Sequence, residues 1–437
     1  MTESEKPASG GMTVRGAASL GIGAMVGAGI FALLGEAGAV AGAATWLSFL
    51  LGGVIATLLG YVVAKLGARY PSSGGLVTFL TQGFGVGHLV GTFAWLLYFA
   101  AIIITAMVAV SFGSYAVALF IGDGASATAA NLFTAGVIVV VAAVQILGAD
   151  AISKIQSLVV VILLAVFAVF IAVTLGEMDT ELLSPSLYPP AFDIVSSIAL
   201  TFFAYLGFAV ISYAGEDLPD PARNLPKATY IALGITTALY ILISLGVFGT
   251  LTVDQVIGYG ETALAEAARP VLGDAGFAMM AIAALLATFT SVNANVYGVV
   301  GLTSALARSG QFPPKFAHPG RFGSTMGMGV SSLLVLLLAL LVDLTAIASL
   351  GSVVALVIFL MVALAGMRLR AETGSNIVII VLGILSTAVV LLVFGIQTWQ
   401  TAPETFVAMI VVLGLAVVLE LIWSAVFRSR QGTPATE

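Results

Sequence analysis

The stretch Gly21-Ile-Gly-Ala-Met-Val-Gly-Ala-Gly-Ile-Phe31 places four glycines inside an apolar segment that is long enough to cross a lipid bilayer. A second stretch, Thr201-Phe-Phe-Ala-Tyr-Leu-Gly-Phe208, has Gly207 near the middle of another apolar segment. Glycine has no Cβ, so it lets the backbone leave the helical conformation or lets a second backbone approach closely. The two stretches therefore predict two helices that are interrupted within a membrane.

The composition excludes several classes of protein. Of the 437 residues, 60% are apolar and only 8% are charged, whereas about a quarter of the residues of a soluble protein are charged. The net charge of −6 offers no basic stripe for nucleic acid. The chain has no cysteine and only two histidines, and no nucleophile or carboxylate pair lies deep in an apolar segment. We therefore expect no metal site, no cofactor and no enzymatic activity.

Twelve apolar stretches have about the length of 20 residues that a membrane-spanning helix needs. They lie at 17–40, 44–65, 89–120, 127–148, 152–176, 192–216, 227–250, 274–306, 326–342, 345–367, 375–397 and 404–427. The sequence thus predicts an all-α polytopic membrane protein embedded in a lipid bilayer, with loops between the spans. It gives no indication of an oligomeric state.

The basic residues predict the orientation in the membrane. If the N-terminus is cytoplasmic and the spans alternate, all but one of the 15 Lys and Arg residues fall in cytoplasmic segments, and the exception is Arg269. Such a bias is typical of the cytoplasmic loops of membrane proteins. We therefore expect a multi-pass protein of the cell membrane whose N-terminal tail (1–14) and C-terminal tail (428–437) are both cytoplasmic.

The two glycine-containing stretches occupy the first and sixth spans, and each opens a block of five spans. Because five is an odd number, the two blocks cross the membrane in opposite directions. Interrupted helices at corresponding positions of two inverted halves are typical of the central site of a secondary transporter. Such a break is tolerated because it lines a cavity. Close helix packing is the commoner role for any single glycine, but the pair favours a binding site.

Several motifs now resemble a known family. In chain order they are Val26-Gly-Ala-Gly-Ile-Phe31, Ala68-Arg-Tyr-Pro-Ser-Ser-Gly-Gly75, Phe202-Phe-Ala-Tyr-Leu-Gly-Phe208 with the inner loop Ala214-Gly-Glu-Asp-Leu-Pro-Asp-Pro221, and Ala307-Arg-Ser-Gly-Gln-Phe-Pro313. Together they resemble the amino acid–polyamine–organocation (APC) superfamily, and most of all its prokaryotic amino acid permeases, from about residue 13 to residue 425.

The resemblance implies a LeuT-like fold of five-plus-five inverted repeats with interrupted helices 1 and 6. The repeats would span 15–176 and 192–367, and helices 11 and 12 (375–427) would be peripheral. The implied activity is secondary-active amino acid transport by alternating access. A transporter-like sensor or a channel is the alternative from a different class, although no charged selectivity ring is apparent.

The resemblance also implies the substrate site. The amide groups of Gly27, Ala28 and Gly29 would hold the substrate carboxylate, because a helix N-terminus supplies free donors and a partial positive charge. Backbone carbonyls near Ala24 and in the sixth helix would accept from the α-ammonium group. The whole predicted site consists of Ala24, Gly27, Ala28, Gly29, Ile30, Phe203, Ala204, Tyr205, Leu206 and Gly207, with Phe208, Met107 and Phe289 as further lining candidates.

The lining candidates are apolar or weakly polar, and this predicts the class of substrate. No Asp or Glu lies in the middle of the first, third, sixth or eighth span, although a di-cation would call for a deep carboxylate. A neutral amino acid, small or hydrophobic, is therefore favoured. The alternative is an amine, polyamine or other small-metabolite permease of the same superfamily.

The sequence leaves the energy coupling open. Several proton-coupled members of the family that the chain resembles place a lysine midway along helix five, at about the position of Leu163 here, and other members carry a glutamate directly after the sixth-helix Gly-Phe, where this chain has Ala209. Lys154 is too far away to substitute, by roughly 13.5 Å at ~1.5 Å per residue. A coupling proton, a sodium ion or substrate exchange all remain open, with Thr290, Ser291, Glu36 and Glu216 as candidate coupling residues. Glu420, in the last span, is expected to extend towards the membrane surface.

Overall fold

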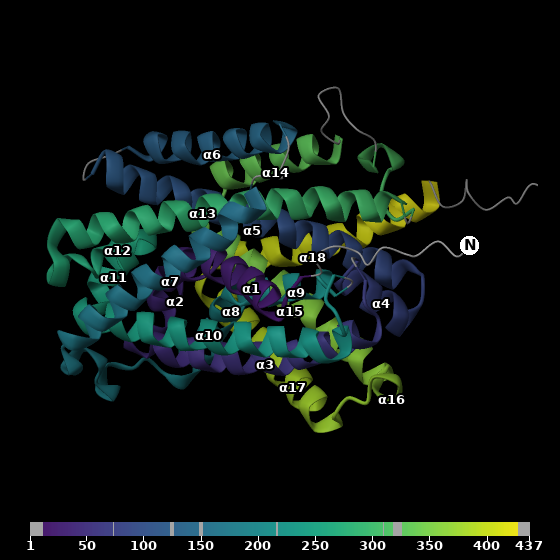
Figure 1. Ribbon diagram of the computed structural model, residues 1–437, viewed down its shortest axis with the longest axis horizontal. Helices are drawn as coiled ribbons and strands as arrows, with labels where there is room; N and C mark the ends of the chain where they lie inside the picture. The colour runs from purple at the N-terminus through teal and green to yellow at the C-terminus, as the bar shows by residue number, and fades with distance from the viewer. Residues whose placement is uncertain are drawn as a thin grey trace, which may run out of the picture.

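The computed structural model describes residues 12–72, 74–122, 126–147, 152–215, 217–308, 310–317 and 326–426. Within these ranges the chain forms helices and no β-strand. The long helices run roughly along the horizontal of Figure 1, and the short helices and connecting segments lie mainly at the two ends of the molecule.

The first half of the chain begins with an interrupted helix, which consists of α1 (Val14–Ala28) and α2 (Ile30–Ala41) with Gly29 between them. The elements that follow are η1 (Gly42–Ala44), α3 (Thr45–Arg69), α4 (Leu76–Phe84), α5 (His88–Phe120), α6 (Ala127–Leu147), α7 (Ile152–Gly176), η2 (Thr180–Leu183) and η3 (Pro185–Leu187).

A second interrupted helix opens the other half, and it consists of α8 (Ala191–Ala204), η4 (Leu206–Ala209) and α9 (Val210–Tyr213). After it come α10 (Pro221–Thr250), α11 (Val253–Tyr259), η5 (Gly260–Thr262), α12 (Ala263–Glu266), α13 (Arg269–Arg308), η6 (Pro314–Ala317), α14 (Met326–Leu341), α15 (Leu344–Arg368), α16 (Arg370–Thr373), α17 (Ile377–Thr401) and α18 (Pro403–Val426).

Polar side chains mark several helix starts. The Thr13 hydroxyl accepts from the Gly16 amide at the start of α1, and the Asp343 carboxylate accepts from the Ala346 amide at the start of α15. Asn376 caps α17 in the same way. These oxygens satisfy amide groups that have no partner within the first turn of a helix, so short polar segments between apolar stretches fix where the spans begin.

Helices occupy all the apolar stretches that the sequence indicates, but their lengths differ. Among the described residues, nine helical stretches are long and apolar enough to cross a membrane, or ten if the bent pair Ala191–Ala204 and Leu206–Tyr213 is one span. The helices α1 and α14 are shorter, and one of the nine stretches, Ile30–Arg69, contains a turn at Gly42, where φ is 53°. The protein is therefore an all-helical polytopic membrane protein.

From the sequence we expect loops between the spans, but several of these segments contain short helices. At one end of the molecule α11, η5 and α12 connect α10 to α13, and at the other end α4 and α16 form short helices (Figure 1). Thr252 and Gln255 form a capping box at the start of α11, which explains why a helix begins in this short polar segment.

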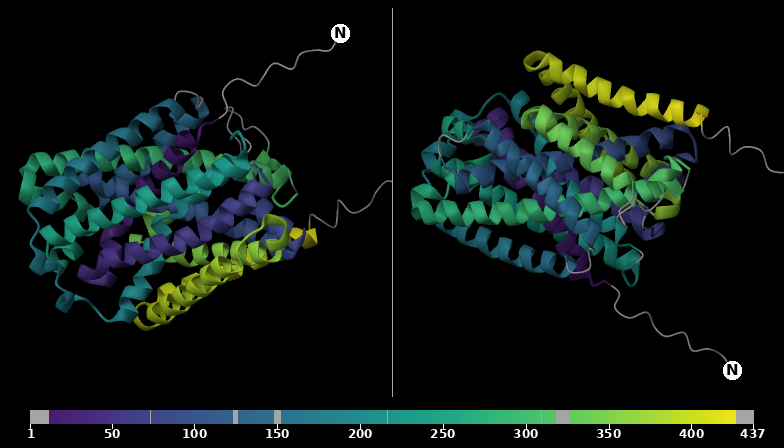
Figure 2. Two further views of the ribbon diagram at one scale, coloured as in Figure 1. Left: turned by 60° about the horizontal axis from the view of Figure 1, so that its bottom comes forward. Right: turned by 90° about the horizontal axis from the view of Figure 1, so that it is seen from above.

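The helices differ greatly in burial. In its most apolar part α15 is 72% buried and α5 is 67% buried, whereas the values are 28% for α17 and 17% for α18. The helix α18 lies along the outside of the bundle in both views of Figure 2, and α17 lies at the same outer edge in the left view. Their exposed side chains include Leu392, Trp399 and Val411, and a continuous apolar surface of this kind suits contact with lipid.

Glu420 of α18 is placed differently from the sequence expectation. Its side chain is fully buried and packs against Gly91 of α5, where there is no room for a Cβ. Oε1 of Glu420 lies 3.5 Å from Nδ1 of His88. The carboxylate therefore joins α18 to the beginning of α5 and does not extend to the surface, because the glycine leaves space for it on the neighbouring helix.

Candidate substrate-binding site

The first helix is interrupted at a single residue. Gly29, with φ −93° and ψ −74°, separates α1 from α2. Its amide donates to the Met25 carbonyl at 2.8 Å, and its own carbonyl accepts from the Leu33 amide at 2.9 Å. A Cβ at this position would lie 2.7 Å from the Ala204 carbonyl oxygen. Glycine is needed here because the sixth span approaches the break so closely.

The second interruption begins at Tyr205, directly after α8. The Tyr205 amide donates to the Phe202 carbonyl at 2.9 Å, and the chain continues in the tighter 3₁₀ turn η4 before α9. The two halves of this span are bent by 42° relative to each other. The change from α to 3₁₀ geometry redirects the backbone carbonyls at this point.

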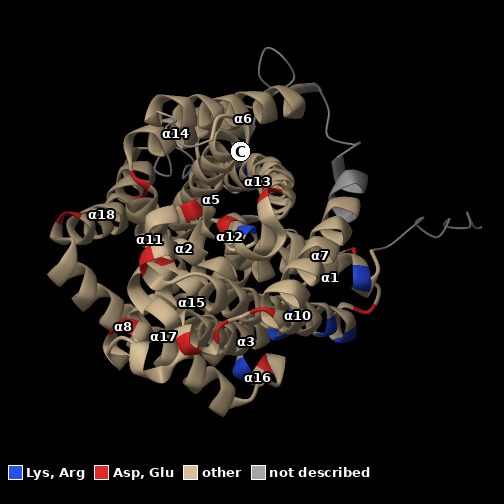
Figure 3. Cartoon of the chain, turned by 90° about the vertical axis from the view of Figure 1, so that its left-hand side faces the viewer, with Lys and Arg blue, Asp and Glu red and all other residues tan. Residues whose placement is uncertain are grey.

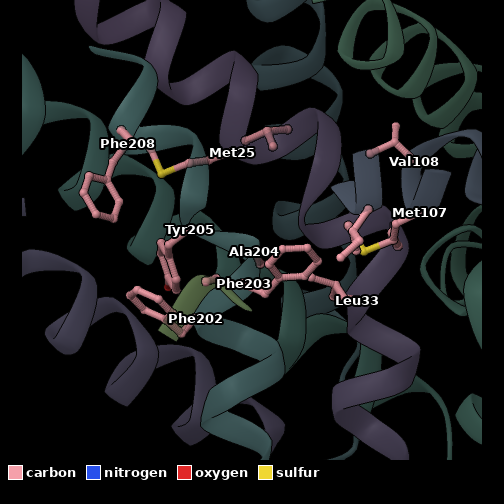
Figure 4. Packing of buried hydrophobic residues seen from close by; sticks show 14 of the residues in the cluster. Met25, Leu33, Met107, Val108, Phe202, Phe203, Ala204, Tyr205 and Phe208 are labelled. Carbon is pink, nitrogen blue, oxygen red and sulfur yellow. The ribbon is translucent and has the colours of Figure 1, made fainter. Parts of the chain in front are cut away.

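The two interruptions lie against each other. Gly207 of η4 packs on the backbone of Ala24 and Met25 in α1, with no room for a Cβ. Figure 4 shows Met25 close to Tyr205 and Phe208, the residues that flank this contact. Two glycines, Gly29 and Gly207, therefore bring together the segments that the sequence singled out, through backbone contact rather than through side chains.

Tyr240 of α10 joins the two interruptions and was not identified from the sequence. Its side chain is fully buried. The hydroxyl donates to the Met25 carbonyl at 2.7 Å and also lies 3.2 Å from the Ala204 carbonyl oxygen. The rings of Phe49 and Tyr205 each lie 5.1 Å from its ring, centroid to centroid. A single tyrosine in an apolar helix carries no signal that distinguishes such a role from packing.

The side chains predicted to line the site are closely packed in this conformation. Ile30, Phe203, Tyr205, Phe208 and Met107 are all at most 1% exposed. The Phe203 ring rests on Gly351 of α15, again with no space for a Cβ, and Figure 4 shows it among its neighbours in the core. The Tyr205 hydroxyl donates to the Phe49 carbonyl at 2.8 Å. The side chains of Leu206, Ala24 and Phe289 are half-buried, and that of Ala28 lies outside the described side chains.

The ion-coupling candidates are placed differently from one another. Ser291 of α13 is 6% exposed, and a Cβ on Gly27 would lie 3.0 Å from the Ser291 Cβ. The Thr290 hydroxyl instead donates to its own helix, at 2.9 Å from the Leu286 carbonyl oxygen. Of these two residues, Ser291 is therefore the one next to the first interrupted helix.

The acidic candidates are also separated. Glu36 is half-buried on α2, and Glu216 lies outside the described residues. Leu163 and Ala209, the positions at which the family resemblance led us to look for a charged coupling group, are 2% and 8% exposed. In the described parts of the chain no group of three or more His, Asp or Glu side chains could hold a metal ion.

A helical bundle with two interrupted spans that meet in its apolar interior is typical of membrane transporters, and comparison with known proteins identifies the family. The family model for amino acid permeases matches residues 13–419. The chain therefore belongs to the amino acid permease family, as the motifs had indicated, and the members that it resembles are transporters rather than enzymes.

Individual relatives cover much of the chain. The inner membrane transport protein YbaT of Escherichia coli (strain K12) is 31% identical over 92% of this chain and 94% of its own. The methylthioribose transporter of Bacillus subtilis (strain 168) is 30% identical over 69% of this chain and 68% of its own. The serine/threonine exchanger SteT of Bacillus subtilis (strain 168) is 28% identical over 69% of both chains.

We predict that Tyr240→Phe destabilises the protein. The change removes the hydroxyl that lies against two buried carbonyls; the Met25 carbonyl keeps the Gly29 amide as a donor, but the Ala204 carbonyl loses the Tyr240 hydroxyl. A buried polar group left without a partner costs about 1–3 kcal/mol. The midpoint of thermal unfolding of the purified protein should fall. Tyr297→Phe is the control because that side chain is 64% exposed, and it should leave the midpoint unchanged. Equal midpoints for the two variants would show that the Tyr240 hydroxyl is not needed.

We predict that Gly207→Ala disrupts the contact between the two interruptions, because the added methyl group would meet the backbone of Ala24 and Met25. Gly234→Ala is a matched control, since nothing lies within 4 Å of a Cβ there, and alanine stabilises a helix by roughly 0.5–1 kcal/mol relative to glycine. Thermal unfolding should show a loss of stability only for Gly207→Ala. A stable Gly207→Ala protein would contradict the close contact.

Proposed function

We propose that this protein is a secondary-active transporter of amino acids that works by alternating access. The main support is that two interrupted spans meet in an apolar interior, where the Tyr240 hydroxyl lies within hydrogen-bonding distance of the Met25 and Ala204 carbonyls. A break in a helix frees backbone donors and acceptors, and it is tolerated in a membrane where it is buried in protein or lines a cavity. Membership of the amino acid permease family supports the same conclusion.

The proposed topology has twelve membrane spans, with five-plus-five inverted repeats at 15–176 and 192–367. Three observations support it: a helix occupies each of the twelve apolar stretches, the two interruptions occur in the first and sixth of them, and α17 and α18 are the least buried helices apart from α6. In this topology α1–α2 and α8–α9 are equivalent helices of opposite orientation.

The proposed location is the cell membrane, with both termini in the cytoplasm. Arg69, Arg308 and Arg368 all stand at the C-terminal ends of their helices α3, α13 and α15, whereas Arg269 begins α13. The basic residues therefore gather at one end of the bundle, as the excess of positive charge on cytoplasmic loops requires. The relative YbaT is named as an inner membrane protein.

The proposed mode of binding uses the backbone at both interruptions. The amides of Gly27, Ala28 and Gly29 would hold the carboxylate, and carbonyls of Ala24, Phe203, Ala204 and Leu206 would accept from the ammonium group. Because the Gly29 amide donates to Met25 in the packed conformation, substrate entry would have to release it. The Phe203 ring, which is 1% exposed and rests on Gly351, would have to move in the same step. Rotation about the glycine breaks would then open one side at a time.

The packed side chains favour a neutral substrate. Ile30, Met107 and Phe203 are apolar and fully or almost fully buried, so they offer no partner for a charged side chain. The name of the relative SteT, a serine/threonine exchanger, is in keeping with a neutral amino acid. Another small metabolite is the second candidate, because the methylthioribose transporter is similarly related.

We expect thermal-shift measurements to distinguish these substrates. A ligand that binds the native state raises stability by RT ln(1 + [L]/Kd). The purified protein should be stabilised by neutral amino acids, such as serine, alanine or leucine, and not by putrescine or spermidine. Stabilisation by putrescine or spermidine alone would favour a polyamine permease, and stabilisation by methylthioribose alone would favour the metabolite alternative.

We predict that transport does not depend on a lysine in the fifth span. At about the position where several proton-coupled relatives are expected to carry this lysine, the chain has Leu163, whose side chain is 2% exposed in the core. Uptake should therefore be sodium-linked, proton-linked through a carboxyl group, or an exchange of substrates. Uptake into proteoliposomes under separate sodium, proton and counter-substrate gradients distinguishes the three. The Lys154→Ala variant should keep the gradient-driven uptake of the parent protein. If uptake is proton-driven and disappears in this variant while the fold stays intact, the prediction that no fifth-span lysine is needed is wrong.

A further inference from the structure

The helix α2 is held at one end of the molecule by the segment that connects α10 to α13. Gly35 of α2 packs directly on the carbonyl group of Gly260 in η5, with no room for a Cβ. One turn further along, Gly38 packs against Phe248 and Val256. Figure 1 shows α11 and α12 at the left of the molecule, with α2 beside them. Half of the first interrupted helix is thus fixed by backbone contact with a connecting segment.

Each glycine of this contact is followed by a glutamate. Glu36 follows Gly35 and Glu261 follows Gly260, and the two carboxylates are close enough to repel each other. Figure 3 looks at this end of the bundle, where acidic residues lie around α2, α11 and α12. Two like charges beside a tight backbone contact are unfavourable if both are ionised.

The Glu261 side chain is half-buried, and its carboxyl group faces α5. Its Oε2 atom is buried and has no hydrogen-bond partner, and the Ser114 hydroxyl lies within hydrogen-bonding reach of the carboxyl group. The hydroxyl of Tyr115, a fully buried side chain, is also without a partner and interacts electrostatically with Glu261. An unpaired phenol and an unpaired carboxylate oxygen are therefore buried together.

The other charged groups around this contact do not neutralise Glu261. On the elements that pack against it, Asp254 and Tyr259 belong to α11 and Glu266 to α12. Arg269 is bound instead to Glu266, at 2.8 Å, and to Asp274. Asp343 adds a further negative charge facing Glu36. Among the residues that the structure describes, no ion pair joins a basic side chain to Glu261.

This environment favours the protonated carboxyl group. Burial, with a further contribution from the Glu36 charge, raises the pKa of Glu261 from its ordinary value of 4.5 to about 7. A group whose pKa is raised in the packed state binds its proton more tightly there than when it is released to solvent. The contact is therefore stabilised by the proton: this stability is fully present below pH 4.5 and is lost as the pH rises through about 7.

We propose that Glu261, with Glu36 beside it, is a proton-binding site that holds α2 against η5, and that loss of the proton releases this half of the first interrupted helix. The inference rests on the proposed function only in placing this site on the outer side of the membrane and in connecting it to alternating access. The Glu261 carboxyl group would be a proton-binding group in a chain whose Leu163 and Ala209 cannot bind a proton. External acid would then favour the outwardly closed arrangement.

The test measures the opening of the contact directly. Val256 of α11 is fully buried against Gly38, and the natural chain has no cysteine, so Val256→Cys introduces a single reporter thiol. Val335→Cys in α14, where the side chain is 1% exposed, is the matched control for global unfolding and for the pH dependence of thiol chemistry. The measurement is the ratio of maleimide-labelling rates of the two variants in detergent, without substrate.

The expected ratio rises with pH. Between about pH 5.5 and about pH 8.5 it should increase on the order of tenfold, because the packed and released states differ in proton affinity. In Glu261→Gln, which is neutral at every pH, the ratio should stay low and flat. In Glu36→Gln the rise should move to lower pH, because one of the charges that raise the pKa of Glu261 has been removed.

Two results would overturn the proposal: a flat ratio in the parent chain, or the same pH profile in the parent and in Glu261→Gln. If Glu261→Gln does not remain monodisperse, the Glu36→Gln profile decides, since an unshifted midpoint contradicts a shared site. The assay contains no amino acid. Failure of amino acid transport in proteoliposomes would therefore overturn the proposed function alone, and a missing pH response would overturn the proton site alone.

Discussion

The structure depends on how buried backbone groups find partners where two helices stop inside an apolar bundle. A buried carbonyl group without a hydrogen-bond partner destabilises the folded state by about 1–3 kcal/mol, and the hydrocarbon core of the bilayer holds no water that could act as the partner. The hydroxyl of Tyr240 reaches the carbonyls of both Met25, which also accepts from the Gly29 amide, and Ala204, so one side chain from a third helix contacts backbone groups of both interruptions. This shared partner holds the two breaks next to each other, and a substrate with an ammonium group would compete for the same carbonyl oxygens.

Glycine makes the first interrupted helix the centre of the fold. Along its length it meets four other elements at positions where a Cβ would be crowded, and the pairs are Gly21 with Ile211 of α9, Gly27 with Ser291 of α13, Gly29 with Tyr240 of α10, and Gly35 with Gly260 of η5. The packing and binding explanations of these glycines are therefore not exclusive. Because glycine has no side chain, it allows the helix to break and also allows each neighbouring element to approach closely. Movement of either half of the helix would therefore change several of these contacts together.

Much of the fold could be predicted because a membrane-spanning helix requires about 20 consecutive apolar residues, which are visible directly in the sequence. The twelve apolar stretches match the helices to within a few residues at most ends, and the glycines of Gly21–Phe31 and Gly207 marked both interruptions. Local pattern was less informative for the connecting segments. The helices α11 and α12 rely on a capping box and on packing against α2, and Glu420 is buried only because Gly91 of another helix leaves space for it. Such complementarity involves residues that are far apart in the sequence.

The sequence by itself determined the membrane class, the position of the two interruptions and the family, because each follows from local composition and from motifs of a few residues. Only the tertiary structure decided which polar groups meet. It brought Tyr240 to the two breaks, placed Ser291 rather than Thr290 next to Gly27, and shielded a carboxylate oxygen of Glu261 from solvent beside Glu36. A tyrosine, a serine or a glutamate has the same local signature whether it faces lipid, its own helix or a distant carbonyl, and its role is fixed by burial and by partners that only folding supplies.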